Sequence, residues 1–549
     1  MKIGQKRPDT DLHASTGWLY IIVCIAALGL YLLGSGSVIQ AWRDLADQVK
    51  MLQVRRSADT HAPTLSVDMR FQNYNELLQQ REQAVQSGVY IPANRDYMTA
   101  TIQMDNTSIP VLMRLYPGPA EHLQASSRWR LDVRTRQDRQ LLGMQRFYLL
   151  PLVQGDGLYQ WAFARTLEHE GILATRYQFV NLTLNGDNWG RYALQEGFGD
   201  ELMTANGRTA GVILEFDAEL LWKSIAHFGS TRSAYADPVA NLLATDFRYF
   251  EIDTFRDATV ARDEDRAAQK DTGIGRLRAL QTGQARASEI FDVEKLGRFL
   301  ALVDLWGANE AISLANLCYY FNPETELLEP IGYSIGAPGG EERLPLEATY
   351  NDPALQASYA REAERLSRPA YLVELQAELG PELLELQRSL QSMGGEYPLP
   401  WGMIKERQEQ IRRSLYPVQP IFAYLGPSTL NMSATIQIDI ANVINLPVEI
   451  LGFDIDGLTF LEVDPSWLRT EASAGLFDDR DGKVILNTSS APVLRYVRFD
   501  IPILEIIRRD KEIDFRQPIE VRVATQILGL GTHQLTLARE GVAEPLLHP

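Results

Sequence analysis

The run from Gly17 to Ile39 constrains this chain most, because it contains no charged residue. With a rise of about 1.5 Å per residue, a helix of this length crosses a hydrocarbon core of about 30 Å. Trp18 and Tyr20 stand where interfacial aromatic residues are expected. The segment therefore predicts a transmembrane anchor over 17–40, and a cleaved signal peptide is the alternative. Basic residues flank it on both sides, so the charge pattern does not decide its orientation.

Composition excludes several classes of protein. The 549 residues carry 53 Lys and Arg against 71 Asp and Glu, a formal charge of −18. Such an acidic chain is not expected to bind nucleic acid or an anionic membrane surface through general charge attraction. The two cysteines, Cys24 and Cys318, cannot build a disulfide framework or a cysteine-rich zinc site. The seven histidines show no metal-binding spacing.

After the apolar run, the pattern of apolar and polar residues differs between a long first region and the last part of the chain. Strand-like alternation and helical segments are mixed up to about residue 420; one predicted helix, 74–88, ends at Gly88 as a candidate cap. The last part alternates apolar and polar residues with frequent turns, which is typical of an antiparallel β-sandwich. We therefore expect five parts: a tail (1–16), the anchor (17–40), a stalk (41–63), a mixed domain (64–420) and a β-sandwich (425–549).

One constellation of motifs is more specific. The stretch from Trp129 to Glu196 contains WRLDVRT, LLGMQRFYL and a strand that returns after an Asn-Gly turn as G-x-Y-x-L-x-E. PVLMRLYPGPAEHL precedes it, and LVDLWGANEAISLANLCYYFNP and LEPIGYSIGAP follow it. Over about 65–340 these segments resemble the CotH family of spore-coat-type proteins. The resemblance implies an α+β, atypical protein-kinase-like domain, here between the predicted transmembrane helix and the β-sandwich.

The family likeness also implies phosphoryl transfer, which needs a cation on the phosphates, carboxylates for Mg²⁺ and an acid to receive the hydroxyl proton. Several family positions depart from this chemistry. Tyr116 replaces the phosphate-binding lysine, and Gln145 replaces a second lysine. Ala311 stands at the position of the base, and Ser334 at that of the metal-binding aspartate. Asp132 lies where the family has basic residues.

Other positions keep suitable groups and are the candidates if the site is active. The carboxylate of Glu310 is adjacent to the missing base, and Asn316 and Glu329 carry oxygen ligands suited to Mg²⁺. The candidates are, for catalysis, Glu310 and Asn316; for metal binding, Asn316 and Glu329; and for nucleotide binding, Arg114, Arg146 and Glu196.

Because the departures remove the phosphate lysine and both negative ligands, we expect a catalytically impaired, pseudokinase-like binding or scaffold protein. With the anchor and the family likeness, this predicts a single-pass membrane protein of a bacterial cell envelope with most of its chain outside the cytoplasm. One alternative is an active protein kinase for secreted or surface proteins, using ATP and Mg²⁺; another is a structural component of an envelope or surface assembly. An inactive protein needs no cofactor. The sequence does not identify a protein partner.

Overall fold

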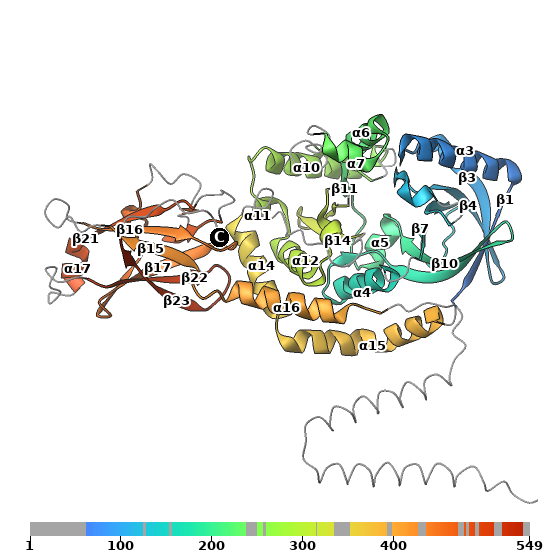
Figure 1. The fold of residues 1–549 in the computed structure, drawn as a ribbon. Coiled ribbons are helices and arrows are strands. Elements are labelled where there is room, and N and C mark those ends of the chain that lie inside the picture. The colour runs from blue at the N-terminus through green and yellow to red at the C-terminus, as the bar shows by residue number, and fades with distance from the viewer. Residues whose placement is uncertain are drawn as a thin grey trace, which may run out of the picture. The chain divides into compact units, whose positions relative to one another are not determined.

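The computed structural model describes residues 62–541 except 125–127, 153–155, 238–249, 256–259, 315, 334–351, 392–397, 427–434, 470–476, 479–481, 489–493 and 510–518. Seven strands close into a barrel in the order β1, β3, β4, β6, β7, β10, β9 (Figure 1). Their bounds are β1 (Thr64–Met69), β3 (Met98–Met104), β4 (Thr107–Leu115), β6 (Leu131–Thr135), β7 (Arg146–Pro151), β9 (Tyr177–Leu184) and β10 (Asp187–Glu196).

Alternation of side chains along the strands builds the barrel core. Val67 on β1, Ile102 on β3 and Val111 on β4 are fully buried in one apolar cluster. Successive residues of a strand point to opposite faces, so every second residue faces this core. The helix α3 (Phe71–Ser87) adds Leu77 to the cluster and ends at Gly88, whose left-handed backbone (φ 79°) confirms the predicted cap.

Closure of the barrel corrects the predicted fold. Strand β1 runs antiparallel to β3 and parallel to β9, with Thr64 opposite Asn181. The side-chain Oδ1 of Asn185 accepts a hydrogen bond of 2.7 Å from the backbone N of Met69. The seven strands thus leave no open edge, and the protein-kinase-like fold implied by the family likeness is wrong. Hydrophobic alternation indicates which face of a strand is buried, but it does not indicate which distant strand becomes its neighbour.

A second sheet follows the barrel, in the order β12, β11, β13, β14, β8. Leu214, Phe216 and Tyr319 on one face belong to the large core formed with the helices. Ile213 and Cys318 on the other face belong to a cluster that includes Tyr148 of the barrel strand β7, so we call it the barrel-facing face. The bounds are β8 (Leu173–Ala174), β11 (Ile213–Asp217), β12 (Glu251–Thr254), β13 (Cys318–Phe321) and β14 (Leu328–Gly332).

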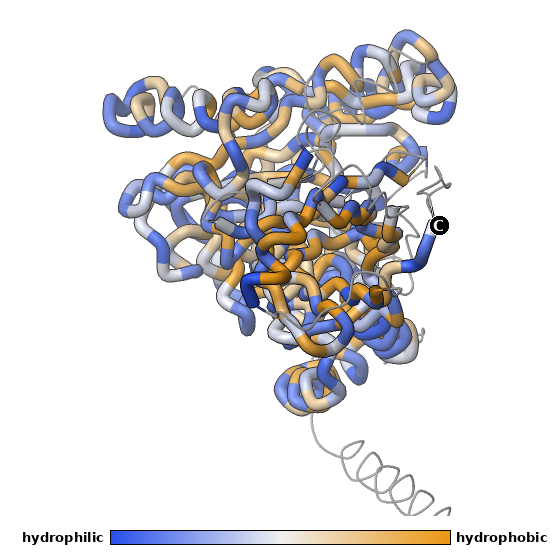
Figure 2. The backbone as a smooth tube through the Cα atoms, turned by 90° about the vertical axis from the view of Figure 1, so that its left-hand side faces the viewer, coloured by the Kyte–Doolittle hydropathy of each residue, from blue (hydrophilic) through white to orange (hydrophobic). Residues whose placement is uncertain are grey.

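The helices supply most of the large core. Figure 2 shows apolar residues gathered in the interior and polar residues along the outer helices. The longer helices are α4 (Asp156–His169), α6 (Glu219–Phe228), α10 (Glu264–Gln281), α12 (Val293–Trp306), α14 (Pro353–Leu366), α15 (Pro369–Gln391) and α16 (Trp401–Leu415). The shorter elements are β2 (Val89–Tyr90), β5 (Gly118–Pro119), η1 (Asn94–Asp96), η2 (Ala120–Leu123), α5 (Asp200–Ala205), α7 (Thr231–Ala236), α11 (Ala287–Ile290) and η4 (Asn309–Ile312).

Helix α12 illustrates how local signals define these elements. The Asp292 side chain accepts a hydrogen bond of 3.1 Å from the backbone N of Lys295 and so caps the first turn. Gly307, with φ 65°, ends the helix. Between them Phe299 and Leu300 are among the buried residues that pack in the large core.

Residues 421–541 form two further sheets around a core of their own. Ile440, Phe453 and Phe499 are fully buried there. One sheet has the order β21, β16, β15, β24, and its strand β24 runs parallel to β15 rather than antiparallel. The bounds are β15 (Ile421–Leu425), β16 (Thr435–Asn442), β17 (Val448–Ile455), β18 (Thr459–Glu462), η5 (Pro465–Trp467), β19 (Phe477–Asp478), β20 (Val484–Leu486), β21 (Val497–Pro502), α17 (Ile503–Arg509), β22 (Val521–Ile527), β23 (His533–Leu537) and β24 (Arg539–Glu540).

The membrane prediction is also corrected. Within the part of the chain that the structure describes, no helix is both long and apolar enough to cross a bilayer. Helix α15 has sufficient length, but Glu374, Glu378 and Glu382 lie along it, and charged side chains are costly in hydrocarbon. The predicted anchor, 17–40, lies outside the described residues. The single-pass topology, the membrane contact and the location outside the cytoplasm are therefore not supported by this structure.

Candidate functional site

A buried carboxylate organises the barrel wall next to the second sheet. Asp132 on β6 is completely buried and accepts hydrogen bonds from Arg146 Nε (3.0 Å) and Arg146 Nη2 (2.9 Å) on β7. Arg114 Nε on β4 donates to it at 3.0 Å, and the Tyr97 hydroxyl donates at 2.7 Å. Burial alone would raise the pKa of Asp132, but the two arginines hold that pKa below its usual value. We call these four residues the Asp132 network.

This network engages both arginines that the sequence predicted as nucleotide ligands. Arg114 and Arg146 are themselves buried, at 7% and 6% exposure. The guanidinium carbon of Arg146 also lies 4.5 Å from the ring centre of Phe255 and 5.5 Å from that of Tyr148. Charge, hydrogen bonding and aromatic stacking therefore hold the Arg146 side chain in place from several sides.

Tyr116 occupies the family position of the phosphate-binding lysine, and its side chain pairs with a second tyrosine. The Tyr116 hydroxyl forms a short hydrogen bond with the Tyr333 hydroxyl, and burial raises the pKa of both side chains. Ser334, the next residue of the chain, lies outside the described residues. Gln145 is half-buried, and its backbone carbonyl accepts a hydrogen bond of 2.8 Å from the backbone N of Thr135. Tyr116 and Gln145 supply no charge to this region.

The remaining nucleotide candidate and the two catalytic candidates have local partners. Glu196 on β10 is buried and binds Arg176, whose Nε donates to Oε2 at 2.9 Å. Glu310 is exposed in η4, and the Asn316 side-chain amide donates to its backbone carbonyl at 3.0 Å. Ala311, between them, is buried. Glu310 and Asn316 therefore do lie close together, but the contact between them closes a turn.

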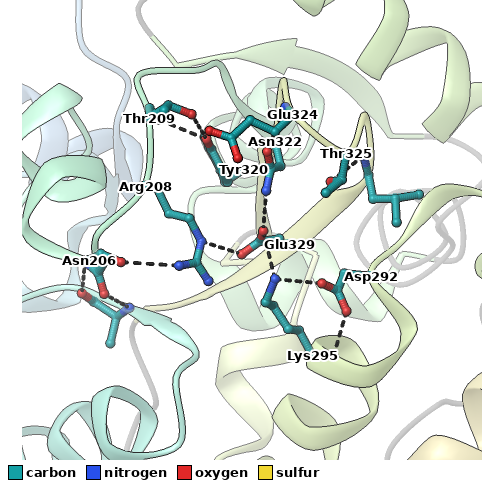
Figure 3. Close-up of polar contacts among 12 residues, drawn as sticks. Asn206, Arg208, Thr209, Asp292, Lys295, Tyr320, Asn322, Glu324, Thr325 and Glu329 are labelled. Atoms are coloured by element: carbon teal, nitrogen blue, oxygen red, sulfur yellow. Dashed lines mark hydrogen bonds and ion pairs between the residues drawn. The ribbon is translucent and has the colours of Figure 1, made fainter.

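The predicted metal ligand Glu329 lies in a separate polar cluster (Figure 3). This β14 residue is 1% exposed and contacts two cations, Arg208 Nε at 2.9 Å and Lys295 Nζ at 3.0 Å. The Asn322 amide donates to it at 2.8 Å, and Lys295 also pairs with Asp292 at 2.6 Å. Both carboxylate oxygens of Glu329 are thus occupied by donors.

A metal ion is not a good fit to the clusters that the structure describes. Mg²⁺ needs several oxygen ligands at about 2.1 Å, and a carboxylate surrounded by cations offers it little. Among the described residues, no group of three or more His, Cys, Asp or Glu side chains is arranged to hold a metal ion. Arg208 and Lys295 were not foreseen as partners of Glu329, because they come from segments distant in sequence.

A second acidic feature was also not foreseen. Glu215 and Asp217 on β11 lie directly opposite Asp253 and Glu251 on β12. Burial, together with the charges of Asp253 and Asp217, raises the pKa of Glu215 to about 7, although the charge of Arg146 opposes this shift. The signal was present in ILEFD and EIDT, in which acidic residues alternate with apolar or small ones. Sequence alone does not pair these two strands.

Comparison with known proteins adds no relative. The sequence matches no family model, and no curated protein is significantly similar to it.

Proposed function

We propose that this chain is a CotH-related binding or scaffold protein that does not transfer phosphate. The family likeness rests on the motifs between residues 65 and 340. The residues that would have to perform the transfer make hydrogen bonds to other protein groups.

The observation that carries the proposal is the pairing of Asp132 with Arg114 and Arg146. Phosphoryl transfer depends on cations placed on the phosphates. Either arginine would have to leave a fully buried carboxylate to contact a phosphate. Separating one partner from a buried ion pair leaves an uncompensated charge, at a cost of about 3–5 kcal/mol.

The acid–base chemistry has similarly little support. Glu310 is exposed to water, and Asn316 uses its amide in the turn. A catalytic carboxylate is usually buried or placed beside a charged neighbour. Among the described carboxylates, Glu215 has a pKa raised to about 7, but it lies at none of the family positions.

The proposal is tested with the full-length chain and ATP. A ligand present at one hundred times its Kd stabilises a protein by about 2.7 kcal/mol, which a thermal melt detects readily. We expect no Mg²⁺-dependent stabilisation by ATP at millimolar concentration, and no transfer of γ-phosphate to the chain itself or to acceptor proteins. Transfer that requires Mg²⁺ would overturn the proposal. Stabilisation without transfer would keep the binding role and make the nucleotide one of its ligands.

A further inference from the structure

The chain contains two Asn-Gly pairs, Asn185–Gly186 and Asn206–Gly207. In such a pair the backbone nitrogen of glycine can attack the side-chain carbonyl carbon of asparagine, because glycine has no side chain to obstruct the approach. Asparagine is accordingly one of the residues that limit the lifetime of proteins at high temperature. The structure places the two pairs in different surroundings, so their chemical lifetimes should differ.

Asn185 and Gly186 form the turn between β9 and β10. Their backbone φ angles, 50° and 85°, are both left-handed, as a two-residue type I′ hairpin turn requires. Both residues are exposed, and a Cβ atom on Gly186 would meet nothing within 4 Å. Among the described residues, neither the side-chain amide nitrogen of Asn185 nor the backbone N of Gly186 donates a hydrogen bond. The leaving group and the nucleophile are therefore both available.

The carbonyl of the Asn185 side chain is held by strand β1. The backbone N of Met69 donates to its Oδ1 at 2.7 Å. An N–H group directed at a carbonyl oxygen stabilises the negative charge that develops there when a nucleophile attacks the carbon. The contact that helps to close the barrel thus also activates Cγ of Asn185.

The second pair is held at every reacting group. The half-buried side chain of Asn206 donates through Nδ2 to the carbonyls of Ala174 (3.2 Å) and Leu202 (2.8 Å), and its Oδ1 accepts from the backbone N of Ala174 at 3.3 Å. The backbone N of Gly207 donates to the carbonyl of Thr204 at 3.1 Å. Several of these hydrogen bonds must break before Gly207 can attack Asn206.

We propose that Asn185 is a site of spontaneous deamidation and that Asn206 is protected from it. The backbone N of Gly186 forms a bond to Cγ of Asn185, its proton passes to the side-chain nitrogen, and that nitrogen leaves as ammonia. Water then opens the resulting five-membered imide at one of its two carbonyls and leaves aspartate or isoaspartate at position 185. Isoaspartate places one additional carbon in the main chain of this two-residue turn.

The modification would act on the closure of the barrel, because residue 185 binds β1 twice. Its backbone N donates to the carbonyl of Val67 at 2.8 Å, and its side chain accepts from Met69. In isoaspartate the main chain runs through the former side chain, so the two contacts cannot both persist. We therefore expect deamidation to loosen the pairing of β1 with β9. This inference is independent of the proposed binding function.

The test follows the two sites in one full-length preparation. The chain is incubated at pH 8 and digested, and the peptides that contain Asn185 and Asn206 are compared by mass spectrometry. We expect deamidation at Asn185 to be at least about tenfold faster, because each hydrogen bond that must break slows the reaction at Asn206. In urea the two rates should become similar, since the unfolded chain lacks these fixed contacts. Equal rates in the folded chain would overturn the proposal, as would a folded chain in which Asn185 stays intact while it reacts in urea.

Two variants make the same chemical change at the two sites. Asn185→Gln should suppress deamidation at position 185, because glutamine has to close a less favourable six-membered ring. Asn206→Gln is the matched control and should leave the rate at Asn185 unchanged. Hydrogen exchange in the deamidated wild type should be faster in β1 than in the fresh protein, and unchanged in β16. Deamidation at position 185 without faster exchange in β1 would overturn its effect on the barrel.

Discussion

At the residue scale, Glu215 is expected to cost the folded chain stability at alkaline pH. Its pKa is about 7 in the folded state against 4.5 for the ordinary side chain, so the folded state binds its proton more tightly. The favourable contribution is fully present below pH 4.5 and is lost as the pH rises through 7. The pKa shift of Glu215 limits its effect on the free energy of unfolding to about 3 kcal/mol. Because water reaches part of the side chain and screens its charge, we expect an effect of about 1–2 kcal/mol.

Glu215→Gln should therefore stabilise the protein by about 1–2 kcal/mol at pH 8 and have little effect at pH 5. Urea unfolding at the two pH values measures the difference. Glu462→Gln is the control, because it makes the same chemical change at an exposed residue of β18; it should change stability by less than about 0.5 kcal/mol at both pH values. An equal effect of Glu215→Gln at pH 5 and pH 8 would show that its carboxyl does not titrate in this range.

Asp132 is expected to have the opposite effect on stability. Asp132→Asn removes the charge that compensates Arg114 and Arg146 and places an amide donor against their N–H groups. We expect a loss of about 3–5 kcal/mol at pH 7, measured by urea unfolding, whereas Asp187→Asn at the exposed first residue of β10 should be nearly neutral. Since the pKa of Asp132 is lowered, the difference should shrink only as the pH falls below about 4. A loss below 1 kcal/mol would mean that the network contributes little to stability.

The charged members of the Asp132 network could be identified from the sequence, but their contacts with one another could not. The sequence shows Asp132 as an acidic residue where the family has basic ones, and it predicts Arg114 and Arg146 as nucleotide ligands. Their mutual pairing was not foreseen, because it depends on β4, β6 and β7 being neighbours in the barrel. The same holds for Glu329, whose partners Arg208 and Lys295 come from two other segments.

At the element scale, the close contact between helices α12 and α14 depends on a glycine, Gly297. A Cβ atom at Gly297 would lie 2.7 Å from Ser358 Cβ and 2.8 Å from the backbone N of Tyr359. Gly297→Ala should therefore destabilise the chain by about 1–3 kcal/mol, because backbone and side chain would have to move apart.

Gly275→Ala is the matched control for this prediction. Gly275 lies within α10, and a Cβ atom there meets nothing within 4 Å. Alanine is the better helix former, so this substitution should stabilise the protein by up to about 1 kcal/mol. Thermal melts of the two variants should shift in opposite directions. A shift of both to higher temperature would mean that α12 and α14 are not in close contact at Gly297.

Elements with strong local signals were predictable, but their partners were not. Helix α3 ends at Gly88 as expected, because glycine tolerates the left-handed backbone found there. The alternation in LSVDMRF (65–71) predicts a strand, and β1 occupies Thr64–Met69, but the parallel pairing of β1 with β9, which closes the barrel, was missed. Periodicity is a property of one segment, whereas strand order depends on contacts between segments far apart in sequence.

At the scale of the whole molecule, the barrel and the C-terminal pair of sheets have separate apolar cores. The barrel core includes Val111, and the C-terminal core includes Phe453; both side chains are fully buried, and the two clusters share no residue. Regions with separate cores can open as separate cooperative units. We therefore expect substitutions in one core to leave amide protection in the other unchanged.

Phe453→Ala should reduce the local free energy of unfolding by about 3–5 kcal/mol, because it leaves a cavity among the C-terminal strands. Hydrogen exchange should speed up in β16, β17 and β22 but not in β3 and β4 of the barrel. Val111→Ala is the reciprocal variant and should accelerate exchange in the barrel strands alone. If either substitution accelerates exchange equally in both regions, the barrel and the C-terminal sheets unfold as one cooperative unit despite their separate cores.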